Sequence, residues 1–287
     1  MKQSKEIRKQ YAKKAIKDIA KFLLRKEKWT ELKENLYILN LVLRHKCVIS
    51  KYDEIKTENQ ALFHKIQKHY QNTNISSSWE KETNWSLKNV FPERWEKQKK
   101  FMEKKFIPLL NKDDVLFDMA CANGEWTRMV AKHVKQMDGY EYAQSMVDFA
   151  IRVNEEENIQ NVHYEQSDAT DFHPEKKYDH GMCLGLFTYL EYEPAKKAIH
   201  NIAACLHNGG YLITKDTLND CGEDIVYHFN YKNGYQAVYC SKEKYCQLFK
   251  EAGFELVCET DLHHVKMVSD TEGVPFVSWG AIWRKNV

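Results

Sequence analysis

The chain has 287 residues, of which 43% are hydrophobic, 13% aromatic and 29% charged, which is the composition of an ordinary globular protein. The aromatic content excludes collagen-like and disordered chains. The longest apolar stretches, such as Leu36 to Leu43, fall short of the roughly 20 residues that a bilayer span requires. The first residues are polar and charged, without the apolar core of a signal peptide. We therefore expect a cytoplasmic protein with no secretory signal and no membrane span.

Charge and helix-breaking residues are distributed unevenly along the chain. Residues 1–70 contain 18 Lys and Arg against 8 Asp and Glu, a net charge of +10, so that the remaining residues carry −8. All 11 glycines lie at or after Gly124, and the first proline is Pro92. Apolar residues recur every three or four positions between Ile7 and Phe22, which is the spacing of one helix face. These features predict a basic, all-helical extension over residues 1–72.

The basic extension has two plausible uses. Lysine-rich helices can bind nucleic acid through its phosphates. They can also present a solvated charged face while their apolar side mediates self-association, and we favour this homo-oligomeric interpretation. The eight cysteines contain no C-x-x-C pair, so we expect reduced thiols rather than a zinc cage or a disulfide framework.

The sequence pattern changes at Val115, where the first predicted strand begins. A short buried-strand run, 115–117, is followed by the small-residue loop Asp118-Met119-Ala120-Cys121-Ala122-Asn123-Gly124 and then by helical spacing. A strand, a small-residue loop and a helix in this order are typical of nucleotide-cofactor binding. The next predicted strand ends at Glu141, where a carboxylate can accept bonds from both hydroxyls of a ribose. Further predicted strands (162–166, 178–184 and 211–215) alternate with helices (145–157 and 193–206), which indicates an α/β fold with a parallel sheet.

From about Trp85 to Arg284 the chain resembles the class I S-adenosylmethionine (SAM)-dependent methyltransferases. The loop from Asp118 to Gly124 is similar to the D-x-G-x-G-x-G motif of that family, with alanines at two glycine positions. The segment 139–146 is similar to the ribose-binding motif, and Asp168-Ala169 to the adenine-binding motif. The resemblance implies a Rossmann-like, mostly parallel sheet of seven strands in a catalytic domain at 111–287, with a linker and cofactor-lid helices at 73–110. It also implies that SAM is held by Trp95, Asp118, Ala120, Ala122, Gly124, Glu141, Tyr142, Met146, Asp168, Ala169 and Leu184.

The residues after the fourth and fifth predicted strands bear on the methyl acceptor. The segment 183–187 contains no D/N-P-P-Y motif of the amino-methylating DNA enzymes, and no Pro-Cys nucleophile for cytosine C5 is present. The acid pair that binds magnesium in catechol-type relatives is also missing, so we expect no metal. Aromatic and titratable side chains cluster after the strands, and we predict Tyr189, His228 and His263 as catalytic residues, the histidines as general bases.

These observations favour metal-independent O-methylation of a small molecule, a sugar, or a phosphorylated or nucleotide-linked metabolite, for example in surface-glycan biosynthesis. Two alternatives stay open: an RNA or protein methyltransferase that docks through the basic extension, and a non-catalytic SAM-binding scaffold. A dehydrogenase is the weakest alternative, because the carboxylate of Asp118 would repel the pyrophosphate of a dinucleotide.

Overall fold

The structure is a computed structural model that describes residues 92–220, 222, 224–230, 235–265 and 276–286, with backbone only at 227–230, 235–236 and 265. The predicted helical extension (1–72), its self-association and its docking to nucleic acid lie outside these residues, as does the linker up to residue 91. Within the part of the chain that the structure describes, no helix is both long and apolar enough to cross a membrane.

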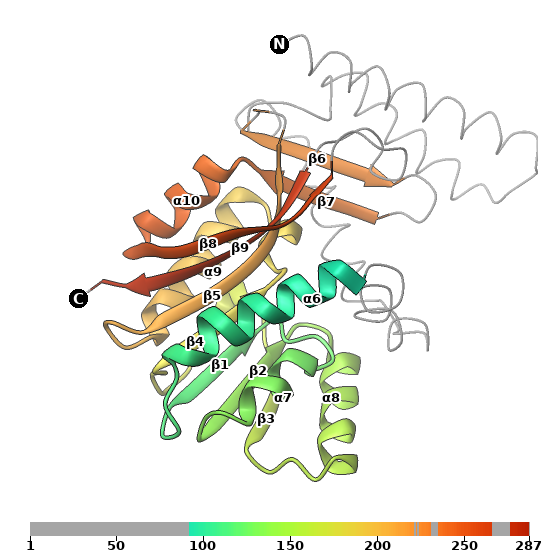
Figure 1. Cartoon of the computed structure of the whole chain (residues 1–287), viewed down its shortest axis with the longest axis vertical. Helices are drawn as coiled ribbons and strands as arrows, with labels where there is room; N and C mark the ends of the chain where they lie inside the picture. Colours follow the sequence, from blue (N-terminus) through green and yellow to red (C-terminus); the bar gives the residue numbers. More distant parts are fainter. Residues whose placement is uncertain (1–91, 221, 223, 231–234, 266–275, 287) are drawn as a thin grey trace, which may run out of the picture.

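The fold is built on one seven-stranded sheet, which confirms the predicted number of strands and their mostly parallel arrangement (Figure 1). The strand order is β3-β2-β1-β4-β5-β9-β8. Pairing is parallel from β3 through β5, whereas β9 is antiparallel to both of its neighbours. Because β9 reverses direction, β8 runs the same way as β5, so the carboxyl ends of β1, β4, β5 and β8 share one edge. The strands are β1 (Val115–Met119), β2 (Gln136–Glu141), β3 (Val162–Gln166), β4 (His180–Leu184), β5 (Tyr211–Asn219), β8 (Phe254–Val265) and β9 (Phe276–Lys285).

Helices cover both faces of this sheet, so adjacent residues of a central strand enter different cores. Met182 and Ile213 pack into the cluster that contains Phe101, whereas Cys183 and Leu212 pack into the cluster that contains Phe249. In Figure 1, α6 crosses the front of the sheet and α9 and α10 lie behind it. The helical segments are α6 (Pro92–Phe101), the π-helical turn η1 (Met102–Phe106), α7 (Glu125–Ala131), α8 (Gln144–Glu156), α9 (Tyr192–Cys205), α10 (Lys242–Glu251) and the 3₁₀ turns η2 (Ile107–Leu109), η3 (Ala169–Asp171) and η4 (Phe187–Tyr189).

Aromatic packing fixes the rear core. Phe249 of α10 stacks on Trp283 of β9 with ring centroids 4.4 Å apart and planes 9° from parallel. Phe117 of β1 packs where a side chain at Gly181 would stand, so only glycine fits at that position of β4. Large, fully buried rings contribute strongly to the stability of such cores, and here they hold β4, β5 and β9 in fixed relation to the helices behind them.

Three predictions about the second half of the chain are wrong in detail. β5 does not end at Lys215 but continues to Asn219, so Asp216 and Thr217 lie inside a strand. His263 and His264 lie within β8 rather than after it. The segment that includes His228, for which no strand was predicted, forms a separate hairpin of β6 (Ile225–Asn230) and β7 (Tyr235–Cys240). The long β9 provides a pairing partner for every residue of β5, and this tertiary pairing extends the strand beyond its local sequence pattern.

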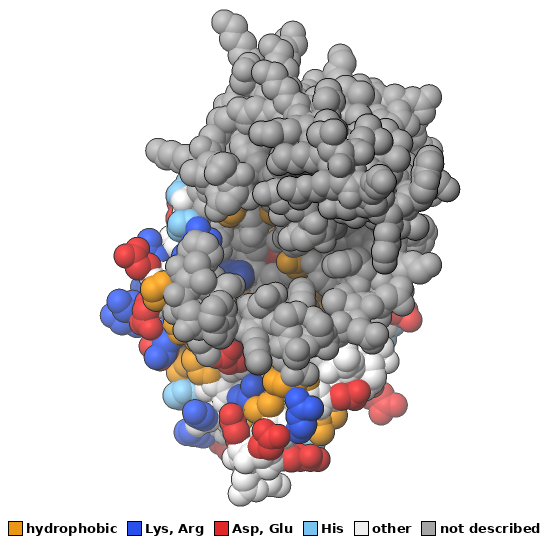
Figure 2. Space-filling view, turned by 90° about the vertical axis from the view of Figure 1, so that its right-hand side faces the viewer, with side chains coloured by type: hydrophobic (Ala, Val, Ile, Leu, Met, Phe, Trp, Pro, Cys, Tyr) orange, Lys and Arg blue, Asp and Glu red, His pale blue; other side chains and the backbone are white. Residues whose placement is uncertain are grey.

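One face of the described region is mixed in charge. In the face shown in Figure 2, Lys and Arg side chains alternate with Asp and Glu, and hydrophobic side chains lie between them. This distribution differs from that of residues 1–70, where positive charge dominates the sequence.

Candidate active site

The carboxyl ends of the parallel strands bring the predicted acidic residues to one edge of the sheet. Asp118 is the penultimate residue of β1 and Glu141 the last residue of β2, and these two strands are directly paired. Asp168 follows β3, which pairs with β2 on its other side. Strand pairing therefore places the three acids on three neighbouring strands, at the edge where α/β folds bind ligands.

The loop from β1 to α7 adopts an unusual backbone conformation. Ala120 and Ala122 have φ values of 60° and 50°, and Gly124 has a φ of 74°. A left-handed conformation costs an alanine about 1–2 kcal/mol, a cost that a glycine avoids. The loop thus has the backbone shape expected of a glycine-rich motif, although two of its three left-handed positions are alanine.

Two side chains outside the motif hold this loop in place. Arg128 donates from Nη1 to the carbonyl of Asn123 at 2.8 Å and to Tyr164 Oη at 3.4 Å. Tyr164 in turn donates from Oη to the carbonyl of Gly124 at 3.3 Å. The Tyr164 ring occupies the space that a side chain at Gly139 would need, so glycine is required at that position of β2. Arg128 and Tyr164 therefore act as positioning residues for the loop.

Asp118 is buried at the base of the loop, with 2% of its surface exposed. Its Oδ2 accepts a hydrogen bond of 2.6 Å from the Thr127 hydroxyl of α7. Burial, together with a smaller effect of the nearby charge of Glu141, raises the pKa of Asp118 from 3.8 to about 7, although the Thr127 hydrogen bond acts in the opposite direction. Such a carboxyl group is poised to change its ionisation when a charged ligand binds beside it.

Glu141 and Asp168 keep acceptor capacity for a ligand. Glu141 accepts 3.0 Å hydrogen bonds from the backbone N–H of Ala122 at Oε2 and of Ala143 at Oε1. Each of these oxygens has a second lone pair. Asp168 uses Oδ1 for both the N–H and the hydroxyl of Thr170, at 2.8 Å each, whereas its Oδ2 makes no hydrogen bond within the described part of the chain. Burial raises the pKa of Glu141, although the N–H groups of Ala143 and Ala122 favour its charged form.

The other predicted cofactor residues lie at varied depths around this edge. Trp95 of α6 packs against Trp126 of α7, with ring centroids 4.7 Å apart. Tyr142 follows Glu141, and its pKa is raised by burial and by the charge of Asp168. Met146 and Ala169 are almost fully buried, at the starts of α8 and η3 respectively, and their contact with the cofactor stays a prediction.

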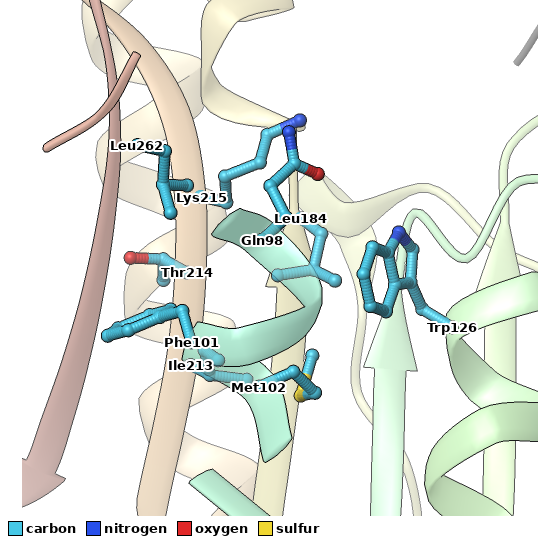
Figure 3. A pocket seen from close by; sticks show the side chains of 9 residues that line it. All are labelled: Gln98, Phe101, Met102, Trp126, Leu184, Ile213, Thr214, Lys215 and Leu262. Atoms are coloured by element: carbon cyan, nitrogen blue, oxygen red, sulfur yellow. The ribbon is translucent and has the colours of Figure 1, made fainter. Parts of the chain in front are cut away.

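A pocket lies between α6 and the carboxyl ends of β4 and β5 (Figure 3). It encloses about 240 Å³ of space, including its opening to solvent. Leu184, one of the predicted cofactor residues, forms part of its wall. Five apolar side chains other than the Trp126 ring line the pocket, and three polar ones complete it: Phe101, Met102, Leu184, Ile213 and Leu262, with Gln98, Thr214 and Lys215.

The three predicted catalytic residues lie on different elements. Tyr189 ends η4, directly after β4, and is partly exposed. His263 follows Leu262, a pocket residue, near the carboxyl end of β8 and is also partly exposed. His228 lies in β6, where the structure describes the backbone only. Strand direction therefore places Tyr189 and His263 at the same sheet edge as the pocket, but no measured contact joins either of them to it.

Sequence reasoning missed several residues of this region. Thr127, Arg128 and Tyr164 support the loop through contacts that no short motif encodes. Gln98 and Lys215 line the pocket, and a sequence signal existed for neither beyond their polarity. Trp126 could have been recognised, because it is the second residue of the helix that follows the loop.

Residues 116–210 match the family described as a methyltransferase domain. No curated protein is similar enough to the sequence to match it. A SAM-dependent methyltransferase from Clostridium acetobutylicum shares the fold at 14% identity and a TM-score of 0.57, covering 73% of this chain and 99% of that one.

Two further solved structures share the fold. The DhpI complex with S-adenosylhomocysteine (SAH) is 14% identical, with a TM-score of 0.55 over 78% of this chain and 97% of that one. The N-methyltransferase NodS from Bradyrhizobium japonicum, also bound to SAH, is 15% identical, with a TM-score of 0.52 over 78% of this chain and 97% of that one. At such identities the structural likeness speaks for the fold, and the domain match supplies the activity class. A methyltransferase domain thus spans residues 116–210, and the fold around it is shared with SAM-dependent methyltransferases, whose cofactor is SAM.

Proposed function

We propose that this class I enzyme transfers the methyl group of SAM to a hydroxyl oxygen of a small molecule, a sugar, or a phosphorylated or nucleotide-linked metabolite, without a metal ion. The observation that carries the proposal is the pocket at the carboxyl ends of β4 and β5, at the same edge of the sheet as the three acids of β1–β3. Its largely apolar wall with a few polar groups is the kind of lining that small-molecule sites have.

The residues at the edge of the sheet suit SAM. The remaining lone pairs of Glu141 can accept the two hydroxyls of a ribose, and Asp168 Oδ2 can accept an exocyclic amine. The loop from Ala120 to Gly124 brings backbone rather than side chains toward the ligand. Bound SAM supplies an electrophilic methyl group on a positively charged sulfur. The carboxylates at this edge favour a cation of that kind.

The chain must align the acceptor and exclude water, because methyl transfer is an in-line displacement. The Trp95–Trp126 pair and α6 provide apolar cover beside the pocket. A hydroxyl acceptor must also lose its proton, and we assign this task to His263, whose ordinary pKa lies near neutrality. The absence of a D/N-P-P-Y motif at 183–187 supports oxygen rather than an exocyclic base amine as the acceptor atom.

The proposal is tested with the full chain, methyl-labelled SAM and a panel of hydroxyl acceptors, including sugars, sugar phosphates and nucleotide sugars. We expect a methyl ether, identified by mass spectrometry and carbon NMR, whose formation is insensitive to EDTA. Transfer to an amine, or transfer abolished by EDTA and restored by a divalent cation, would contradict the proposal.

The role of His263 is tested by His263→Asn, with His264→Asn as the matched control. His264 is an exposed neighbour held by Asp261 and Asp220. Loss of the general base predicts a fall in kcat of about 10²–10⁴-fold with SAM affinity unchanged. The control should retain kcat within a factor of about three. Equal activity of the two variants would remove His263 from the mechanism.

A further inference from the structure

The pocket contains a positive charge without a counter-charge. Lys215 lies on β5 directly beside Leu184, the last residue of β4. Its Nζ stands about 4.0 Å from the position that a side chain at Gly185 would take, beyond the end of β4. Burial lowers the pKa of Lys215, and Asp216 is the acid that opposes this effect. Within the described residues, the ammonium group makes no hydrogen bond or ion pair.

The neighbouring acid does not neutralise this lysine by contact. Asp216 follows Lys215 in the same strand, so its side chain points to the opposite face of the sheet. There it accepts hydrogen bonds from the N–H and the hydroxyl of Thr188, at 3.1 and 3.2 Å, and from Tyr245 Oη at 2.8 Å. Asp216 is therefore already occupied behind the sheet, whereas Lys215 faces the pocket in front.

A second polar group without a partner stands next to Lys215. Gln98 of α6 is only 8% exposed, yet its amide has no hydrogen-bond partner in the part of the chain that the structure describes. Figure 3 shows the ends of the Gln98 and Lys215 side chains together at one rim of the pocket, pointing the same way, with Trp126 across from them. Both groups are hydrogen-bond donors that face the pocket without a protein partner among the described residues, so a ligand that accepts hydrogen bonds could bind to both.

We propose that Gln98 and Lys215 form a subsite for a carboxylate or phosphate group of the methyl acceptor. An ammonium and an amide N–H₂ converge as donors, and an oxyanion is the group that satisfies both and supplies the missing negative charge. The apolar floor of Phe101, Ile213 and Leu262 suits the carbon atoms that carry this group. The inference rests on the proposed function and deepens it, because it selects acidic acceptors from the wider class.

Strand order separates this subsite from the residues that hold the cofactor. Glu141 ends β2 and Lys215 lies on β5, with β1 and β4 between them. Three strand spacings amount to about 14 Å. The acids thus occupy one half of the edge and the Gln98–Lys215 pair the other, which favours the acceptor over the cofactor as the source of the oxyanion.

The test uses the full chain with its lysines dimethylated by ¹³C-formaldehyde, which keeps their charge and makes each visible by NMR. The Lys215 signal is identified by its loss in Lys215→Met, and Lys197, an exposed lysine of α9, serves as control through Lys197→Met. Inorganic phosphate and acetate are titrated at constant ionic strength in the presence of saturating SAH. We expect the Lys215 signal to shift and saturate, the Lys197 signal to drift without saturation, and Gln98→Leu to weaken phosphate binding about tenfold.

Three outcomes would overturn the inference. A Lys215 signal that ignores both anions shows that no oxyanion subsite exists, while intact SAH binding leaves the proposed function standing. Phosphate that binds only before SAH is added, together with a Lys215→Met variant that loses SAH affinity about tenfold, assigns the subsite to the carboxylate of the cofactor. A saturating response at Lys197 as well as Lys215 means an adventitious ion only. Absence of SAH binding by the unmodified protein would instead count against the proposed function.

Discussion

The two halves of the sheet edge differ in charge and in how their polar groups are satisfied. The half formed by β1–β3 carries Asp118, Glu141 and Asp168, each of which accepts hydrogen bonds from the protein itself. The half formed by β4, β5 and β8 is largely apolar, and its two rim groups, Gln98 and Lys215, have no partner among the described residues. A cationic cofactor suits the first half and an anionic acceptor suits the second. The contrast therefore indicates that β1–β3 bind the cofactor and that β4, β5 and β8 bind the acceptor.

The largest effect should follow from removing the acid at the end of β2. We expect Glu141→Ala to weaken SAM binding by at least about 100-fold, because two hydrogen bonds to a charged acceptor are lost and each contributes about 1.5–3 kcal/mol. Calorimetric titration measures the change. Glu165→Gln, at an exposed position of the adjacent β3, is the control and should bind SAM normally. A Glu141→Ala variant that binds SAM as the parent does would remove the acid from the site.

The pH dependence of SAM binding tests the role of Asp118. Because burial raises its pKa to about 7, this carboxyl group is mostly protonated at pH 6 and mostly ionised at pH 8. If the ionised form binds the cationic cofactor, affinity rises by roughly tenfold over this interval. In Asp118→Asn the rise should be much smaller. A parent protein whose affinity stays constant between pH 6 and pH 8 contradicts this role.

Ionisation of Asp118 should also lower the free energy of unfolding as the pH rises, whereas it should raise the affinity for SAM. A raised pKa in the folded state means that the stability contributed by the protonated carboxyl is fully present below pH 3.8 and is lost as the pH rises to about 7. Asp118→Asn escapes this loss while keeping an acceptor for Thr127. We expect the variant to be more stable than the parent at pH 8 by at least about 1 kcal/mol, or roughly 3 °C in Tm. Thermal unfolding should show the advantage shrinking toward pH 5, and an advantage that is the same at both values would point to another cause.

The smallest effect concerns the alanines of the loop. Ala120→Gly and Ala122→Gly should each stabilise the protein by up to about 1 kcal/mol, because glycine adopts a positive φ without strain. The control is Ala204→Gly at an exposed position of α9, which should destabilise by about 1 kcal/mol. Urea denaturation measures the free energy of unfolding of each variant and so distinguishes stabilisation from destabilisation. Destabilisation by all three substitutions would mean that the loop is not strained at its alanines.

The acidic half of the edge could be predicted from sequence, whereas the other half could not. Asp118 and Glu141 stand at the carboxyl ends of short buried strands and Asp168 follows the next strand by two residues, so strand pattern and spacing place them at one edge of the sheet. Lys215 reads as the end of a strand that in fact continues to Asn219, because β9 pairs with it throughout. Gln98 reaches the pocket only because α6 crosses the sheet at that point, and no local pattern specifies such a crossing. The hairpin of β6 and β7 was also missed, although its two strands lie close in sequence and, among the described strands, pair only with each other.

The most direct test of separate cofactor and acceptor sites titrates each of two variants, Glu141→Ala and Lys215→Met, with two ligands. One ligand is SAM, and the other is inorganic phosphate added in the presence of SAH. The account predicts that Glu141→Ala loses SAM binding, whereas Lys215→Met retains SAM affinity within about twofold. The phosphate affinity of Lys215→Met should fall by roughly tenfold or more. If Lys215→Met loses SAM as severely as Glu141→Ala does, the two halves form a single cofactor site and the account is contradicted.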